Sequence, residues 1–168
     1  MKIGDGVEQA IHCVLVLSGL SEAGVLSAAA LAEFHGVSPS YLLKHLQAMA
    51  GAGLLESVAG PKGGYRLAKP VDRITLLDIV VAVEGPEPAF RCSEIRQRGP
   101  KPVASHFFKA PCAVNAAMLK AERAYRAELK RVTVADLRGD PGSPLGKAIG
   151  ARTCAFFDLH ERNRSIAP

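Results

Sequence analysis

Four cysteines, and a glutamate and a histidine spaced four residues apart, are the side chains of this sequence best suited to chemistry. Glu8 and His12 share one face of a predicted helix, because residues four apart lie one above the other. Cys13 follows His12 but points about 100° away around the helix. The remaining cysteines are Cys92, Cys112 and Cys154. In a cytosolic protein, which we expect this to be, such cysteines are thiols or metal ligands rather than disulfides.

A second informative pattern is SPSYLLKHLQAMAGAGLLESVAGPKGGYRL, residues 38–67. Ser38 is a typical N-cap residue and Pro39 suits the first helical position, so a helix is predicted to begin there. Apolar residues then recur at helical spacing, at Leu42, Leu43, Leu46 and Met49. Two short strands, 54–58 and 65–67, flank a glycine-rich loop that carries one cation, Lys62. A helix before a basic hairpin is typical of a winged helix-turn-helix, which is a DNA-binding module.

The helix that precedes this pattern completes the motif. It is predicted over residues 27–35, with Ser27 as its N-cap. Gly36 and Val37 form the short turn between the two helices. The second helix would enter the major groove with its N-terminal residues nearest the bases, where hydroxyl groups and lysine contact phosphates or base edges. The residues expected to bind DNA are Ser38, Ser40, Tyr41, Lys44, His45, Lys62, Gly63, Gly64 and Tyr65.

The composition is consistent with a nucleic-acid partner. The 168 residues include 21 Lys and Arg against 16 Asp and Glu, and the resulting net charge of +5 suits a polyanion. No apolar run reaches transmembrane length, so we expect a cytoplasmic protein without membrane contact. We find no nucleophile–base pair and no phosphate-binding loop, and therefore predict no enzymatic activity.

The remaining helices follow from periodicity, and the predicted fold is mainly α with a small β wing. Amphipathic helices are predicted over 6–19 and from Thr75 to about Glu84, and an aperiodic loop follows over 89–110. Pro111 is expected to open a long helix to about Arg131. Its apolar seam suits a second subunit: Val114, Met118, Ala121, Tyr125, Leu129 and Val132. Thr133 is expected to cap a short turn, and a further helix is predicted from Ser143.

Several segments, taken in order, resemble one bacterial regulator family. They are GVEQAIHCVLVL, SPSYLLKHLQAM, AGLLESVAGPKGGYRLAKP, ITLLDIVVAVEG and VTVADL, within residues 1–137. Together they resemble the IscR/NsrR type of winged-helix transcription regulators, and most closely the redox-sensing [2Fe–2S] members with only two cluster cysteines (RsrR-like). The resemblance implies a homodimeric repressor that binds an inverted-repeat operator in double-stranded DNA. It also implies four segments: a winged helix-turn-helix domain (1–84), a cluster-binding loop (85–110), a dimerisation helix with its cap (111–138) and a C-terminal tail with a short helix (139–168).

Two departures from the family pattern bear on function. Cluster-bearing members typically carry three cysteines before the long helix, whereas this loop region has Cys92 and Cys112 alone. Ala59 stands where an arginine commonly precedes the wing glycine. The resemblance therefore implies a [2Fe–2S] cluster bound by Cys92 and Cys112 of one subunit and by Glu8 and His12 of the other. Imidazole ligation raises the potential of such a cluster, and we expect its one-electron redox state to control DNA binding.

Other interpretations of these residues remain open. His106 in the loop, or Cys13, could substitute for one of the four ligands. The protein could instead be a cluster-free regulator that uses Cys92 and Cys112 as a thiol switch. A zinc-binding protein without DNA function is a third interpretation, although it would leave the wing unexplained.

Overall fold

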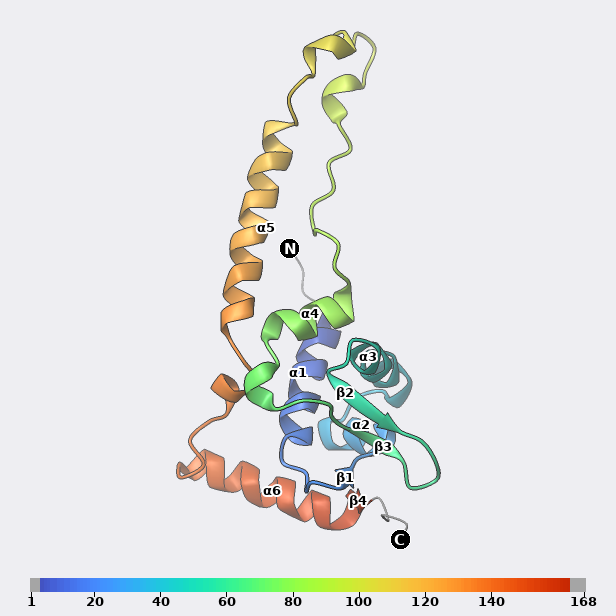
Figure 1. Cartoon of the computed structure of the whole chain (residues 1–168), viewed down its shortest axis with the longest axis vertical. Helices are drawn as coiled ribbons and strands as arrows, with labels where there is room; N and C mark the ends of the chain where they lie inside the picture. The colour runs from blue at the N-terminus through green and yellow to red at the C-terminus, as the bar shows by residue number, and fades with distance from the viewer. Residues whose placement is uncertain (1–3, 164–168) are drawn as a thin grey trace.

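Three helices form the body of the protein around an apolar centre. They are α1 (Asp5–Leu17), α2 (Ala28–His35) and α3 (Pro39–Gly51), shown in Figure 1. The computed structural model describes residues 4–163, so the first three residues of the predicted DNA-binding domain and the last five of the predicted tail lie outside it. The largest fully buried side chains of the centre include Leu26, Leu31, Leu42, Leu46, Met49, Leu54, Ile74 and Ile79.

The apolar faces that periodicity predicts for α1 and α3 are buried almost throughout. In α1, Val7, Ala10, Val14 and Leu17 are buried and Ile11 is half-buried. Leu43 is the exception, because it is 37% exposed on the outer side of α3. Ser27 caps α2 as predicted, by accepting a hydrogen bond from the backbone N–H of Ala30. Gly36 ends α2 in a left-handed conformation (φ 66°), which lets the chain turn at once into α3.

A small sheet lies against these helices and forms the wing. The wing is the antiparallel hairpin of β2 (Leu55–Val58) and β3 (Gly64–Leu67) together with its loop, residues 59–63. Leu26 bridges to Tyr65 through two backbone hydrogen bonds, which joins β3 to the short strand β1 (Gly24–Val25). The hairpin is thereby fixed to the body along one edge.

Helix α4 (Leu76–Glu84) covers α1 and α3. Thr75 and Asp78 form a capping box at its start, in which the Thr75 hydroxyl accepts from the Asp78 N–H and the Asp78 carboxylate accepts from the Thr75 N–H. The turn η1 (Val71–Arg73) links β3 to this helix. The predicted helix is therefore present, and it begins at Leu76, one residue after the predicted start at Thr75.

Beyond α4 the chain leaves the body as a long arm, which is prominent in Figure 1. The arm consists of the loop 85–112, with the short turns η2 (Ile95–Gln97) and η3 (Ser105–Phe107), and of α5 (Ala113–Arg131). The prediction that Pro111 is the first residue of this helix is wrong. Cys112 occupies the N-cap position of α5, and Pro111 precedes it. No residue of α5 is buried, and Val114 and Met118 are 61% and 43% exposed.

The chain returns to the body at Val134, which is fully buried and donates its N–H to Ile74 O. Val134 is the N-cap residue of the turn η4 (Ala135–Leu137), one position after the predicted cap Thr133, and the Thr133 N–H and hydroxyl donate to the Asp136 carboxylate. The predicted tail helix is α6 (Pro144–His160), capped by Ser143, and it crosses the end of the body opposite the arm (Figure 1). The final strand β4 (Arg162–Asn163) pairs with β1. No helix within residues 4–163 has the length and apolarity needed to span a membrane.

Candidate nucleic-acid interface and cysteine site

The N-terminal turn of α3 presents polar side chains to solvent. Ser38, Ser40, Tyr41 and Lys44 are all exposed. Ser38 occupies the N-cap position as predicted, but its hydroxyl makes no capping bond to the helix and lies 3.2 Å from the Ser40 hydroxyl. The hydroxyl groups at this helix end therefore remain accessible to an external partner.

His45 lies in the interior and not on this surface. Its side chain is 6% exposed and packs edge-on against Tyr41, with ring centroids 4.6 Å apart. A Cβ at Gly6 on α1 would overlap the imidazole, so the missing side chain of that glycine makes room for the ring. Burial, and then the charge of Lys44, lower the pKa of His45. Because the ring packs α3 against α1, we leave His45 out of the DNA contacts proposed below.

The wing residues predicted to bind DNA divide into exposed and buried ones. Lys62 is exposed at the loop, whereas Gly63 is buried and Tyr65 is 8% exposed within the core. A Cβ at Gly63 would overlap the carbonyl of Val58, so the loop folds tightly on itself. A Cβ at Gly64 would meet the Leu26 backbone at the junction with β1. Gly63, Gly64 and Tyr65 thus shape and anchor the loop that presents Lys62.

In the arm, Cys92 and Cys112 lie side by side although twenty residues separate them in the sequence. The Cys92 side chain lies close enough to Cys112 to lower the pKa of the Cys112 thiol. Cys92 is exposed and Cys112 half-buried, and both are free thiols. The structure therefore places these two cysteines next to one another within a single chain.

The surroundings of Cys112 favour its thiolate. Its pKa is lowered by the backbone N–H of Asn115, then by that of Val114, by Arg96 and by the Cys92 thiol. The Asn115 and Val114 N–H groups belong to the first turn of α5, where helical N–H groups have no partner within the helix. Sequence reasoning missed Arg96, because an aperiodic loop gives no indication of which side chains it brings together. This guanidinium binds both carboxylate oxygens of Glu94 and lies 4.9 Å from the Phe108 ring centroid.

The other two predicted ligands lie on the body. Glu8 and His12 are exposed on α1, and the His12 ring centroid is 5.9 Å from that of His35 on α2. No group of three or more His, Cys, Asp or Glu side chains suited to a metal ion occurs within the described residues. One chain thus gathers two of the four proposed donors, and two thiols fit half of a [2Fe–2S] ligand set.

The alternative cluster ligands, Cys13 and His106, are positioned less favourably than the four proposed ones. Cys13 is buried in the core, and burial raises the pKa of its thiol to about 12, which opposes metal binding. His106 lies in η3 with its ring 4.1 Å from that of Phe107, and it does not join the cysteine pair in a three-donor group among residues 4–163. Cys154 is exposed on α6.

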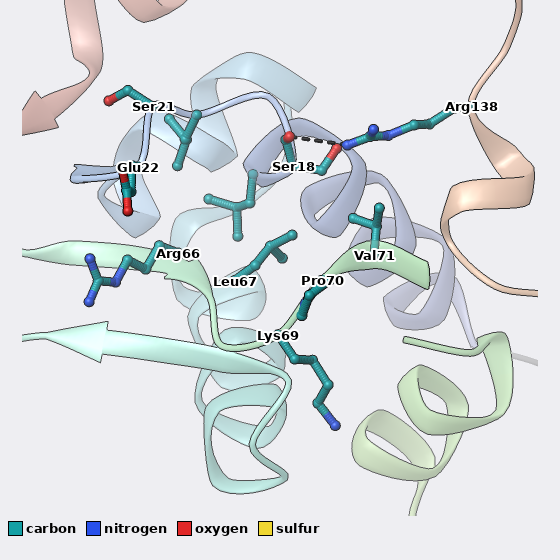
Figure 2. Close-up of a pocket in the computed structure, with 11 residues that line it drawn as sticks. Ser18, Ser21, Glu22, Arg66, Leu67, Lys69, Pro70, Val71 and Arg138 are labelled. Atoms are coloured by element: carbon teal, nitrogen blue, oxygen red, sulfur yellow. Dashed lines mark hydrogen bonds between the residues drawn. The ribbon is translucent and has the colours of Figure 1, made fainter. Parts of the chain in front are cut away.

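A pocket of about 310 Å³ opens between the end of α1, β3 and the linker after α5 (Figure 2). Three cations line it, namely Arg66, Lys69 and Arg138, with Glu22 as the one carboxylate among its lining residues. Arg138 donates a hydrogen bond of 3.1 Å to the Ser18 carbonyl (Figure 2). No histidine or cysteine lines the pocket, so it offers no nucleophile–base pair of the usual kinds.

A profile of the Rrf2 family, described as an iron-dependent transcriptional regulator, matches residues 3–140. The chain belongs to the Rrf2 family. Over 138 residues this Rrf2 chain is 33% identical to YffB of Lactococcus lactis, which is named as an HTH-type transcriptional regulator, and the match covers 82% of the chain and 86% of YffB. It is 46% identical over 85 residues to the similarly named YwgB of Bacillus subtilis. That match covers 51% of the chain and 54% of YwgB, so the chain spans about half the length of this relative.

Solved structures of the same fold agree with the family assignment. The oxidised form of Staphylococcus aureus CymR superposes with a TM-score of 0.58 at 26% identity, over 82% of this chain and 95% of CymR. CymR of B. subtilis, described as its global cysteine regulator, gives a TM-score of 0.59 with the same identity and coverage. T. potens IscR gives 0.58 at 22% identity over 90% of each chain, which supports the fold. The protein is thus a DNA-binding transcriptional regulator of the Rrf2 family and not an enzyme.

Proposed function

We propose that this Rrf2 protein is a homodimeric repressor, acting in the cytoplasm, whose binding to an inverted-repeat operator is controlled by the redox state of a [2Fe–2S] cluster. Cys92 and Cys112 of one protomer and Glu8 and His12 of its partner are the proposed ligands. The DNA contacts are proposed at Ser38, Ser40, Tyr41 and Lys44 on α3 and at Lys62 in the wing. A two-fold dimer presents two such surfaces and therefore requires two half-sites.

The observation that carries this proposal is the thiol pair in the arm. Two cysteines in contact, one with a lowered pKa and both near the Arg96 guanidinium, form a preorganised pair of thiolate donors. Thiolates are the usual protein ligands of iron–sulfur clusters, and two imidazoles replace two of them in one known class of [2Fe–2S] centre. A bound cluster would supply one-electron chemistry at this site.

The exposed arm supports ligands shared between two protomers. Val114 and Met118 on α5 leave an apolar face uncovered in a single chain, whereas the body buries its apolar residues. A second copy would cover this face, as the predicted seam requires. Each arm would then lie against the partner's body, where Glu8 and His12 are exposed on α1.

His12 offers a route from this site to DNA. Its ring lies near His35, the last residue of α2, and Gly36 and Val37 lead from there into α3. A displacement of His12 would shift His35 and, through it, the turn between α2 and α3. The two recognition helices of a dimer must match half-sites at a fixed spacing, so a small displacement of each lowers operator affinity.

The direct test is anaerobic purification followed by an absorption spectrum and counts of iron and acid-labile sulfide. We expect visible absorption with iron and sulfide in the wild type. Cys92→Ala and Cys112→Ala are expected to lose all three. Cys154→Ala is the matched control, because it removes an exposed thiol from α6, and it should retain the cluster. Wild-type protein without iron or sulfide after anaerobic reconstitution would refute the cluster proposal.

The same thiol contact favours a second candidate function, a cluster-free thiol switch. Cys92 and Cys112 would lose two protons and two electrons to hydrogen peroxide and form a disulfide, while the peroxide is reduced to two molecules of water. In iron-free protein, peroxide treatment should then change operator affinity, and a dithiol reductant should restore it. Mass spectrometry should find a loss of two hydrogens that joins the peptides of Cys92 and Cys112. Unchanged affinity after oxidation of both thiols would exclude the switch.

A further inference from the structure

The C-terminal segment formed by α6 and β4 lies outside the part of the chain that the family profile matches, and it folds back onto the body. The Arg152 guanidinium lies 4.3 Å from the centroid of the Phe34 ring and donates to the Phe34 carbonyl. Phe156 packs edge-on against the same ring at 5.0 Å. A cation–π contact and an aromatic pair therefore attach α6 to α2, the first helix of the helix-turn-helix.

The end of this segment is attached at a second place, beside the wing sheet. The Glu161 carboxylate accepts hydrogen bonds from the backbone N–H and the hydroxyl of Ser21. Arg162 pairs with Val25 in the antiparallel β4–β1 ladder, and the single bridge between Leu26 and Tyr65 joins this ladder to the β2–β3 hairpin. The backbone of Arg162 is thus fixed by the residue before it and by the strand beside it.

From this position the Arg162 side chain reaches the wing loop. Its Nη1 donates a hydrogen bond of 3.0 Å to the carbonyl of Pro61, next to Lys62. The side chain is exposed, and within residues 4–163 it forms no ion pair. A guanidinium has five N–H donors, so most of them remain available to an acceptor outside the chain.

We propose that Arg162 is a DNA-contacting residue of the wing, contributed by the C-terminal segment. The inference rests on the proposed wing–DNA interface and adds a second cation to it beside Lys62. Two cations at one exposed loop, Lys62 within it and Arg162 hydrogen-bonded to it, suit the closely spaced phosphates of a duplex. Arginine is also the side chain that enters a narrow minor groove, where the potential is most negative. The contact at Pro61 presents the guanidinium at the loop that would approach that groove.

A purely structural role for Arg162, tethering the loop, makes different predictions from a DNA contact. Arg162→Gln keeps a side-chain N–H donor for the Pro61 carbonyl but removes the charge. Arg162→Lys keeps the charge but loses the planar fork. If Arg162 only tethers the loop, Arg162→Gln should bind DNA as the wild type does. If Arg162 contacts a phosphate or the groove, Arg162→Gln should bind DNA more weakly because it lacks the charge.

The experiment measures dissociation constants of the full-length protein over a series of salt concentrations. The probe is a duplex recovered from a random pool by the wild-type protein. For Arg162→Ala and Arg162→Gln we expect weaker binding and a salt slope smaller by about 0.9. The ratio of either variant's dissociation constant to that of the wild type should therefore fall about 3.5-fold between about 50 and 200 mM salt. Arg162→Lys should keep the wild-type slope and lose preference for duplexes with a narrow, A-tract minor groove at the wing position.

Arg138→Ala is the matched control, because Arg138 is likewise exposed and likewise donates one hydrogen bond to a backbone carbonyl, that of Ser18. It removes the same charge away from the wing and should leave the slope unchanged. Wild-type slope and affinity in Arg162→Gln would overturn the inference and leave a tether. Wild-type protein that recovers no duplex would overturn the proposed DNA interface as well, so the two failures are distinguishable.

Discussion

The body and the arm of this protein differ in how completely a single chain covers its apolar residues. In the body, Leu42, Leu46 and Met49 of α3 are fully buried against neighbouring helices. In the arm, no residue of α5 is buried and Ile95 in the loop is 71% exposed. A single chain thus buries the apolar core of the body, whereas the apolar face of the arm requires a partner to cover it. The cysteine pair lies in the arm, and the proposed DNA-contact residues lie in the body and its wing.

The largest expected effect is a difference between the two regions in how much a substitution lowers the free energy of unfolding. Leu46→Ala removes a fully buried side chain from the body and should lower the free energy of unfolding by about 2–5 kcal/mol. Ile95→Ala in the arm, measured at a dilution at which the protomers are separate, should change it by less than about 0.5 kcal/mol. Chemical denaturation of both variants measures the difference. Equal losses would show that the arm belongs to the same cooperative core.

Met118→Asp tests whether the arm is completed by a second copy. In the proposed dimer this aspartate would be buried without a partner, which costs several kcal/mol or is relieved by dissociation. Sedimentation should find monomers that no longer bind the operator. Lys120→Asp is the control, because Lys120 is exposed about 200° away around α5 and should leave the dimer intact. A tight dimer of Met118→Asp would place the interface elsewhere.

Lys62→Ala tests the exposed edge of the body. Loss of one phosphate contact should weaken binding to all duplexes and lower the salt slope by about one unit. Lys147→Ala removes a similar exposed charge from α6 and should have no such effect. An unchanged slope for Lys62→Ala would show that Lys62 does not contact DNA.

The smallest expected effect is a dependence of the free energy of unfolding on pH that arises from two histidines of the body, His35 and His45. Burial is the main reason why the pKa values of His35 and His45 are lowered in the folded state. The unfolded chain then binds more protons, so stability should fall as the pH drops from about 6.5 through the folded-state pKa values. His45→Gln should reduce this dependence, and His106→Gln in the arm should not. Denaturant titrations at several pH values measure it, and an identical dependence in wild type and His45→Gln would contradict the account.

The sequence predicted local features well because their causes are local. The apolar spacing of α1, the caps at Ser27 and Thr75 and the hairpin around its glycine-rich loop each depend on residues a few positions apart. The burial of His45 could not be predicted in this way, because the space for its ring comes from Gly6 on another helix.

Features of the site that depend on distant residues also escaped prediction. Arg96 gave no signal in an aperiodic loop, although it lies near both cysteines. The contact from Arg162 to Pro61 joins residues 101 positions apart and depends on two-residue strands that carry no periodicity. The resemblance supplied the cysteine pairing, and packing of the arm brings the two thiols together.

The central claim is that the body of one protomer and the arm of another build one site, and a mixed dimer tests it most directly. One protomer carries Cys92→Ala and Cys112→Ala, its partner carries Glu8→Ala and His12→Ala, and differential tags isolate the mixed species. With ligands shared between protomers, one of the two sites keeps all four donors. The mixed dimer should then hold half the iron and sulfide of the wild type, while both parent homodimers hold none. A mixed dimer without iron and sulfide would contradict the account.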